Sequence, residues 1–236
     1  MSDTLRADRK GSLNEPPVIA IDGPAASGKG TVAQGVAEAL RLHYLDSGSL
    51  YRLVALKASR EAVAADDESR LAALARSLEV AFDRQRICLD RLDVTEALRG
   101  EAVSAAASRI AVFPAVRQAL VGRQRAFRRP PGLVADGRDM GTVVFPDAIL
   151  KIYLMASAEV RAGRRYKQLI DKGNSVTLEG LLHDIRERDA RDSARAAAPL
   201  KAAADALILD TTDLTIAASI AFVLERAKML IRPASD

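Results

Sequence analysis

The sequence predicts an α/β protein with three layers, in which helices cover both faces of a central five-stranded parallel sheet. Two observations lead to this prediction. Short apolar runs alternate with helical patterns along the 236 residues, which is the order of strand–helix–strand crossover units. In addition, a glycine-rich run joins the first apolar run to the first helical pattern, as in α/β proteins that bind phosphates at the end of a strand.

Five apolar runs have the length and composition of central strands. They comprise residues 18–22, 43–46, 133–136, 149–155 and 206–210. Several of them end in aspartate, which places carboxylates at the strand ends where open α/β sheets bind their ligands. The helices expected between the strands include residues 31–42. The last helix is expected from about residue 215 to 231, because Pro233 follows its end.

The remaining segments divide the chain into a core and three additions. Residues 1–15 are polar and are expected to form a disordered tail. Residues 67–105 contain two short strand-like runs, which predict a small β-rich insert. Residues 171–198 are densely charged and predict a polar helical hairpin that can close as a lid. The core then consists of residues 16–66, 106–170 and 199–236.

The composition is that of a soluble globular protein with a basic balance. Of the 35 basic residues 27 are arginine, and the formal net charge is +4. Arginine suits phosphate recognition, although a GC-rich genome also explains most surface arginines. The single cysteine, Cys88, rules out an internal disulfide and fits a reducing compartment. Because no apolar run is long enough for a leader or a membrane span, we expect a cytoplasmic protein without a membrane partner. We also expect a monomer.

The glycine-rich run nearly matches the phosphate-loop (P-loop) motif, which reads glycine, four residues, Gly-Lys, then Ser or Thr. Its glycines allow main-chain N–H groups to point inward, and the following helix adds positive charge beneath bound phosphates. Lys29 is expected to reach the β- and γ-phosphates of ATP. The alternative, a glycine-rich turn with a chance lysine, is disfavoured by the strand–loop–helix context. The residues expected to bind ATP are Gly23, Pro24, Ala25, Ala26, Ser27, Gly28, Lys29, Gly30 and Thr31.

Gly30 stands where the motif has Ser or Thr, so the hydroxyl arrives one position late, at Thr31. The main-chain N–H of Gly30 is retained, which preserves the phosphate cradle. Mg²⁺ must then bind the hydroxyl of Thr31 or keep more of its water shell. Asp136, at a strand end, is a second candidate for holding Mg²⁺, in the outer shell of the ion. The Lys-Gly-Thr order is similar to that of nucleoside monophosphate kinases, and the Asn-Lys-x-Asp guanine motif of GTPases is missing.

Two further runs offer a second site for an anion. LDSGSLYR (45–52) follows a predicted strand and opens a helix, so Ser47 and Arg52 can hold a phosphate at the helix N-terminus. The alternative is that Ser47 is an ordinary N-cap. DGRDMG (136–141) follows another strand and presents Arg138 and Asp139 beyond it, although Asp-Gly at a strand end is also a common turn.

The charged segment carries arginines at helical spacing. Arg188, Arg191 and Arg195 are three and four residues apart and share one face, with Asp189 and Asp192 alongside. By itself this pattern fits a solvated helix with internal ion pairs. Beside a phosphate loop it predicts guanidinium groups that stabilise the charge on a phosphoryl group during transfer.

The chain resembles the bacterial cytidylate kinase family from about residue 17 to 230. The resemblance rests on the runs DGPAASGKGT, LDSGSLYR, FPAVRQAL, QRAF, DGRDMGTVVFPDA and RERDARDSAR, of which GRDMGTVVFP is highly specific to that family. It implies a P-loop kinase that transfers the γ-phosphoryl group of ATP, with Mg²⁺, to CMP and dCMP in pyrimidine nucleotide metabolism. The β-rich insert would belong to the acceptor side.

The resemblance also implies which residues hold the acceptor. Its phosphate would be held by Ser47, Arg52 and Arg138. Its base would be read by Ser108, Arg117 and Asp139. This fits the chemistry of cytosine, because a carboxylate accepts from the N4 amino group while arginine donates to N3 and O2, and uracil inverts that pattern.

The lid residues receive roles from the same resemblance. Arg188 and Asp192 would serve the acceptor nucleotide, its sugar included, and Arg195 would serve the phosphates. The expected catalytic groups are Lys29, Arg138, Arg188 and Arg195.

Three alternatives remain open at this point. A kinase of the same type could act on UMP, AMP or a metabolite hydroxyl. A nucleotide-dependent switch or binding module could use the same loop. A nucleic-acid binder is suggested only by the basic balance, and the stretch QRAFRRPPG (124–132) lacks the interleaved aromatic residues of single-strand binders, so we expect no nucleic-acid partner.

Overall fold

The structure is a computed structural model that describes residues 15–83 and 86–231. The predicted tail, residues 1–15, lies outside the described residues except for Glu15, and so does Pro233. Among the described residues, no helix combines the length and the apolar character needed to span a bilayer.

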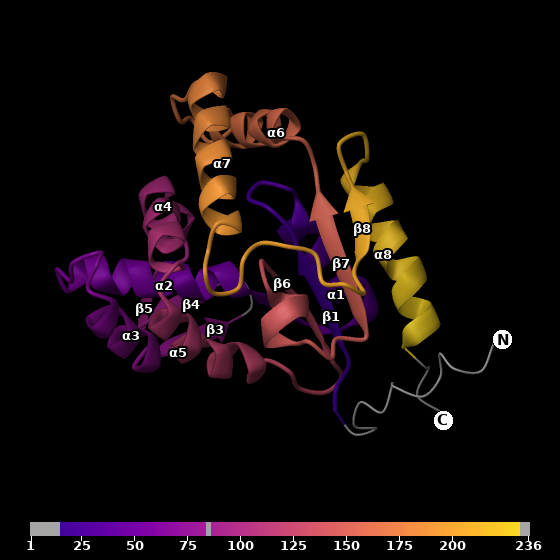
Figure 1. Cartoon of the computed structure of the whole chain (residues 1–236), viewed down its shortest axis with the longest axis horizontal. Helices are drawn as coiled ribbons and strands as arrows, with labels where there is room; N and C mark the ends of the chain where they lie inside the picture. Colours follow the sequence, from indigo (N-terminus) through magenta and orange to yellow (C-terminus); the bar gives the residue numbers. More distant parts are fainter. Residues whose placement is uncertain (1–14, 84–85, 232–236) are drawn as a thin grey trace.

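The central sheet has five parallel strands, as predicted, in the order β2-β6-β1-β7-β8 (Figure 1). The predicted runs match these strands within one residue at either end. The strands are β1 (Val18–Asp22), β2 (His43–Asp46), β6 (Leu133–Gly137), β7 (Leu150–Met155) and β8 (Leu207–Asp210).

The two faces of the sheet are buried in separate apolar cores. Alternate residues of β1 divide between them, because successive side chains of a strand point to opposite faces. Val18 and Ala20 belong to the larger core, whereas Ile19 and Ile21 belong to the smaller one, and all four are completely buried. This confirms the three-layer arrangement and explains why the strand is a continuous apolar run.

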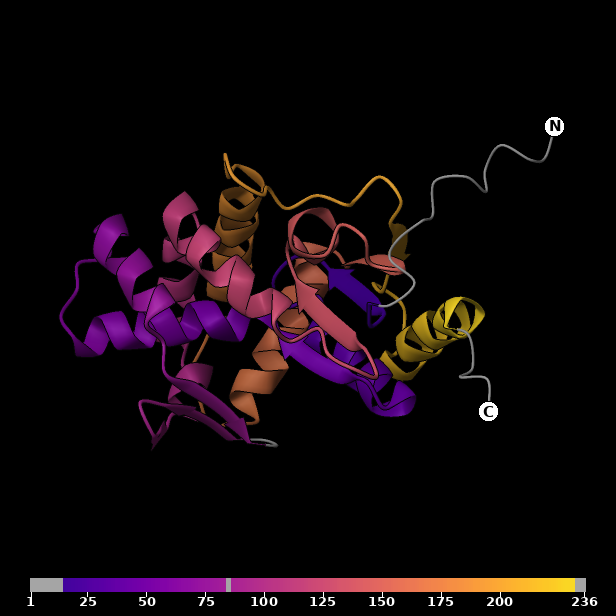
Figure 2. The same cartoon turned by 90° about the horizontal axis from the view of Figure 1, so that it is seen from below.

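Helices α1 (Lys29–Leu40) and α8 (Ile216–Leu230) pack together on the side of the smaller core. Their contact is close at Gly35, where a Cβ would lie 2.5 Å from the Cδ1 atom of Ile220. The larger core lies against α2 (Ser47–Arg60) and, farther from the sheet, against α4 (Glu101–Ile110) and α5 (Pro114–Arg125). In both views these last helices lie well away from α8 (Figures 1 and 2).

The segment predicted as a β-rich insert holds a small antiparallel sheet together with helical structure. Its strands are β3 (Val80–Asp83), β4 (Arg86–Leu89) and β5 (Leu92–Asp93). The first two overlap the predicted runs, residues 78–82 and 86–90, while β5 is only two residues long. Two elements of this segment were not predicted: the helix α3 (Glu68–Arg76), which packs on α5, and a short turn of 3₁₀-helix, η1 (Ala97–Arg99).

The hairpin expected within residues 171–198 is formed differently. That segment contains one helix, α7 (Leu178–Ser193), and its partner is α6 (Ala158–Ile170), which precedes the charged segment. We call α6 and α7 the lid hairpin; Figure 1 shows it beyond the ends of the strands. The prediction of two helices inside 171–198 was wrong because the turn between α6 and α7 lies there, including Gly173 at φ 78°.

Candidate active site

The phosphate loop joins β1 to α1, and its two glycines are needed for different reasons. Gly28 is the N-cap of α1 and has a φ of 87°, which side chains other than glycine rarely adopt. Gly23 is required by close packing, because a Cβ there would lie 2.1 Å from the carbonyl oxygen of Leu154. Backbone freedom was expected at both glycines, but of the two only Gly28 has a positive φ.

Lys29 is the first residue of α1, and its ammonium group donates to the carbonyl oxygen of Pro24, 3.1 Å away across the loop. Burial and the positive charge of Arg138 lower the pKa of Lys29 to about 7, although Asp136 opposes this shift. The hydroxyl of Ser27, in the same loop, is buried and has no hydrogen-bond partner among the described residues. A cation and an unpaired hydroxyl inside a loop of main-chain amides are suited to bind an anion.

The low pKa of Lys29 leads to a prediction for proton uptake. Before nucleotide binds, Lys29 is largely neutral at about pH 8, and a polyphosphate beside it favours the charged form. We expect close to one proton to be taken up per ATP bound at about pH 8, and much less at about pH 6. Calorimetry in two buffers of different ionisation enthalpy measures this uptake. Equal uptake at both pH values, or in a Lys29→Met variant, would contradict the assignment.

The second predicted anion site is at the N-terminus of α2. Its N-cap is Asp46, which accepts from the main-chain N–H of Ser49 and forms an ion pair with Arg52. The alternative of Ser47 as an ordinary N-cap is therefore wrong. Ser47 is buried against β6, the neighbour of β2 in the sheet. A Cβ on Gly137 of β6 would lie 2.5 Å from the Oγ atom of Ser47. Ser47 therefore lies against Gly137, which directly precedes Arg138 in the chain.

The turn after β6 is held by Asp22, a residue that the sequence analysis did not assign. Its carboxylate accepts from the main-chain N–H groups of Met140 and Gly141, both at 2.8 Å. Burial raises the pKa of Asp22 to about 7, against the effect of these two hydrogen bonds. Its position at the end of a predicted strand was the available signal. These bonds fix η2 (Met140–Val144) directly after Arg138 and Asp139.

Arg117 and Asp139 form a buried ion pair beside the turn. Arg117 also donates to the carbonyl oxygen of Ala111 at 3.1 Å and lies 5.7 Å from the ring centroid of Tyr51. A buried pair of this kind leaves hydrogen-bonding capacity for a ligand on each partner. Ser108, in α4, is also buried, and its hydroxyl accepts from Arg191 at 3.1 Å.

On the lid hairpin, Asp192 is almost completely buried between two arginines. Arg138 donates to it at 2.8 Å, and Arg195 forms an ion pair with it. Burial raises the pKa of Asp192, but Arg138 and Arg195 hold it below its usual value. Because Asp192 is buried, the alternative of a solvated helix is wrong for this part of α7, although the pair of Asp192 and Arg195 is internal to the charged segment.

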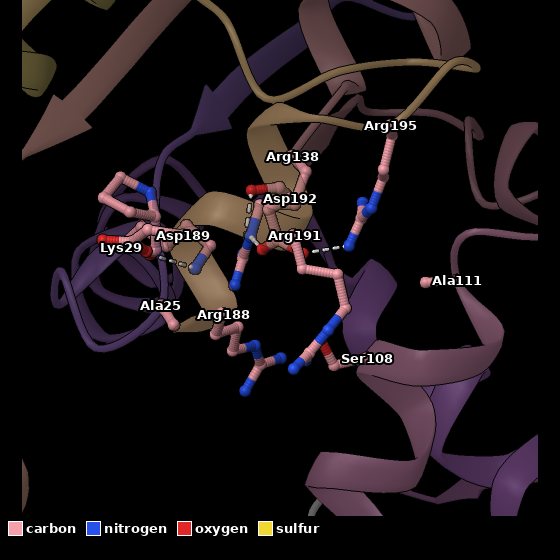
Figure 3. Close-up of polar contacts among 12 residues, drawn as sticks. Ala25, Lys29, Ser108, Ala111, Arg138, Arg188, Asp189, Arg191, Asp192 and Arg195 are labelled. Atoms are coloured by element: carbon pink, nitrogen blue, oxygen red, sulfur yellow. Dashed lines mark hydrogen bonds and ion pairs between the residues drawn. The ribbon is translucent and has the colours of Figure 1, made fainter. Parts of the chain in front are cut away.

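Arg188 brings a further cation to the same place. Burial and the charge of Arg138 lower the pKa of Arg188 to about 10. Figure 3 shows Lys29 and Ala25 on one side, Ser108 on the other, and the side chains of Arg138, Arg188 and Arg191 between them. Such a concentration of guanidinium groups is unfavourable by itself, and an anion placed there relieves it.

The lid hairpin contacts α4 through one stripe of that helix. Glu101, Ser104 and Ser108 are spaced three and four residues apart. Glu101 pairs with Arg165 of α6, and Ser104 accepts from Arg188 at 3.2 Å. The sequence analysis missed this stripe because its serines and alanines resemble an ordinary helix surface.

Arg161 connects the lid hairpin to the phosphate loop and was also missed. Its buried guanidinium donates to the carbonyl oxygen of Ala25 at 3.0 Å and pairs with Asp189 at 2.5 Å. The signal was weak, because one arginine among several in a charged helix has no distinctive pattern.

One predicted metal-side residue, Thr31, is exposed on α1. Asp136 is buried and accepts from the hydroxyl of Tyr44 at 2.6 Å. The predicted ATP-side and acceptor-side residues thus lie in the phosphate loop and α1, in α2, in and directly after β6, and on α4, α5, α7 and the segment that follows α7.

Comparison with known proteins agrees with this geometry. The cytidylate kinase family profile matches residues 19–229. The chain belongs to the cytidylate kinase family. A cytidylate kinase of Burkholderia pseudomallei (strain 1106a) is 59% identical over 218 residues, which are 92% of this chain and 96% of that protein. A cytidylate kinase of Bordetella bronchiseptica is 58% identical over 214 residues, 91% of this chain and 96% of that protein.

Membership of the cytidylate kinase family decides between the alternatives that the sequence left open. The chain is a phosphotransferase of the P-loop nucleotide kinases, and the nucleotide switch and the nucleic-acid binder are no longer competing interpretations. The match covers the phosphate loop, the turn after β6 and the lid hairpin together.

Proposed function

We propose that this member of the cytidylate kinase family transfers the γ-phosphoryl group of ATP to CMP, and also to dCMP, with ADP and CDP or dCDP as products. The observation that carries the proposal is the buried pair of Arg117 and Asp139 beside a cluster of arginines and a phosphate loop. The pair suits a pyrimidine edge with both donors and acceptors, and the cationic groups suit two sets of phosphates.

ATP is bound by the phosphate loop, residues 23–31. Main-chain N–H groups and the N-terminus of α1 surround the phosphates, and Gly28 gives the loop its left-handed turn. Lys29 leaves the carbonyl oxygen of Pro24 and contacts the β- and γ-phosphates. Its ammonium group is then aimed at the charge that develops on the group in transfer.

CMP is recognised by the buried pair and Ser108. Asp139 accepts from the N4 amino group of cytosine, while Arg117 donates to N3 and O2. UMP presents N3–H and O4 in place of N3 and the N4 amino group, so Asp139 would face an acceptor and Arg117 a donor, while O2 is the same in both bases. A site built on such hydrogen bonds discriminates strongly against the mismatched base.

The arginines place the two nucleotides end to end. Ser47, Arg52 and Arg138 hold the phosphate of CMP, and Asp192 binds its sugar. Arg188 and Arg195 neutralise the phosphoryl oxygens as transfer proceeds. The accepting phosphate oxygen is already anionic near neutral pH, so no general base is required. The lid hairpin excludes water that would otherwise hydrolyse ATP.

The residues near Gly30 fit a magnesium ion. Asp136 supplies a buried carboxylate, and a Cβ on Gly30 would lie 3.4 Å from it, so the carboxylate faces the loop. Oxygen ligands and retained waters are what Mg²⁺ prefers. We propose that the ion is held through Asp136 and a water or the hydroxyl of Thr31. When bound, Mg²⁺ neutralises charge on the phosphates of ATP. We further propose that the enzyme acts as a monomer in the cytoplasm.

An acceptor panel tests the proposed function. The purified chain is incubated with ATP, Mg²⁺ and one of CMP, dCMP, UMP, AMP or water, and the diphosphates are separated by chromatography. We expect CDP and dCDP, with UMP used at least about a hundredfold less efficiently. Preferred use of UMP or AMP would contradict the assignment of the base pocket, and consumption of ATP without an acceptor would contradict the kinase reaction itself.

A further inference from the structure

The phosphate loop lacks a side-chain hydroxyl at position 30, and a hydroxyl from another strand lies beside that position. A Cβ built on Gly30 would lie 3.4 Å from Oδ2 of Asp136 and 3.6 Å from the hydroxyl oxygen of Tyr44. A serine or threonine at position 30, as in the usual motif, would therefore meet the carboxylate that Tyr44 already contacts.

Tyr44 is brought there by the order of the strands. It lies on β2, which pairs in parallel with β6, and Tyr44 is opposite Val134. Asp136 lies two residues farther along β6, so both side chains reach the end of the sheet where the phosphate loop begins. The phenol donates its single proton to Oδ2 of Asp136 at 2.6 Å. The lone pairs of its oxygen remain free to accept a hydrogen bond from a water.

A merely structural explanation is that a partly buried tyrosine has found an acceptor for its hydroxyl. The position of the acceptor argues for more than this. Asp136 is buried next to the loop, close enough for its charge to act on Lys29. The hydrogen bond from Tyr44 to Oδ2 fixes the orientation of the carboxylate beside Gly30 and leaves the second carboxylate oxygen of Asp136 without a bond from Tyr44.

We propose that Tyr44 is a positioning residue, whose hydroxyl beside position 30 holds Asp136 toward the hydrated Mg²⁺ of bound ATP. The inference rests on the proposed role of Asp136. It assigns the support of the metal-side carboxylate to a residue of β2, which lies beside the position where the loop has glycine.

The test is a Tyr44→Phe variant, which removes one oxygen and leaves the ring. Binding of Mn²⁺ in place of Mg²⁺ is measured by electron paramagnetic resonance in the presence of a non-hydrolysable ATP analogue. Loss of a partner that orients a ligand typically weakens metal affinity at least about tenfold. We expect this loss in Y44F, while the affinity for the analogue without metal is unchanged.

Two further variants separate positioning from folding. Gly30→Ser combined with Y44F restores a hydroxyl beside Asp136, and we expect it to recover most of the Mn²⁺ affinity. Asp136→Asn is expected to weaken Mn²⁺ binding, and Y44F in that background to add little, because Tyr44 acts through Asp136. Tyr166→Phe, which removes an exposed phenol on the lid hairpin, is the matched control with unchanged affinity.

The proposal is overturned if Y44F binds Mn²⁺ as the wild type does, whatever its melting temperature. It is also overturned if D136N binds Mn²⁺ normally, a result that remains available if Y44F does not fold. Failure of the proposed function gives a different result, namely no phosphorylated nucleotide from the wild type in the acceptor panel.

Discussion

Replacement of Lys29 by alanine is expected to lower turnover at least about a hundredfold, because an oriented charge on the group in transfer usually contributes this much. Lys29 starts α1 and lies within the phosphate loop, where its ammonium bonds to the carbonyl oxygen of Pro24. In the proposed mechanism the ammonium exchanges that carbonyl for phosphate oxygens, so the loss is expected mainly in kcat. Steady-state rates of CDP formation at saturating ATP and CMP measure it.

Lys57→Ala is the matched control for this variant. Lys57 lies on α2 and pairs with Asp90, so its removal also breaks an ion pair with a carboxylate. It has no place in the proposed site, and we expect its turnover to stay within about twofold of the wild type. Near-normal turnover in Lys29→Ala would remove the loop lysine from the mechanism, even if ATP binding were weaker.

The second large effect is expected from Asp139→Ala. We expect kcat/KM for CMP to fall about a hundredfold or more, because the N4 amino group loses its acceptor and Arg117 loses its partner. The affinity for an ATP analogue should change by no more than about threefold, since Asp139 does not belong to the phosphate loop. Calorimetry measures the two affinities separately, and an equal loss for both nucleotides would contradict the base-reading role.

Folding must be controlled in this experiment. Removing one partner of a buried ion pair leaves the other charge uncompensated, at a cost of about 3–5 kcal/mol. Asp139→Asn keeps the shape and one acceptor, and its amide can donate to O4 of uracil. We therefore expect the ratio of UMP to CMP use to rise in Asp139→Asn, while its melting temperature falls less than that of Asp139→Ala. An unchanged ratio would indicate that Asp139 serves stability alone.

Some features of the molecule were predicted because they depend on neighbours in the sequence. The five strands follow from short apolar runs, and the loop follows from the spacing of Gly23, Gly28 and Lys29. The limits of the lid hairpin were predicted less well. Helix α6 directly follows β7, as a core crossover helix would, and only its packing against α7 identifies it as half of the hairpin. Helix α3 was missed because only nine residues carry its pattern.

The candidate active site also combines residues that were predicted from the sequence with contacts that only the structure shows. The resemblance to a family indicated single residues such as Asp139 and Asp192, and the structure supplied the partners of each. Asp22 had only its position at a strand end as a signal, and Arg161 had no pattern of its own. Asp22 accepts from a main-chain turn 118 residues away. Arg161 donates to a carbonyl oxygen of the phosphate loop.

The sequence by itself determined the class of fold, the phosphate loop and, through its resemblance, the family, because each of these is encoded in short runs of residues. Only the tertiary structure decided which charged groups meet. Strand β6 lies between β2 and β1 in the sheet, although much of the chain separates it from both. That order of strands brings Tyr44 to Asp136, and packing of α7 brings Asp192 to Arg138. No local pattern specifies such contacts, because they depend on how the strands and helices are arranged in space.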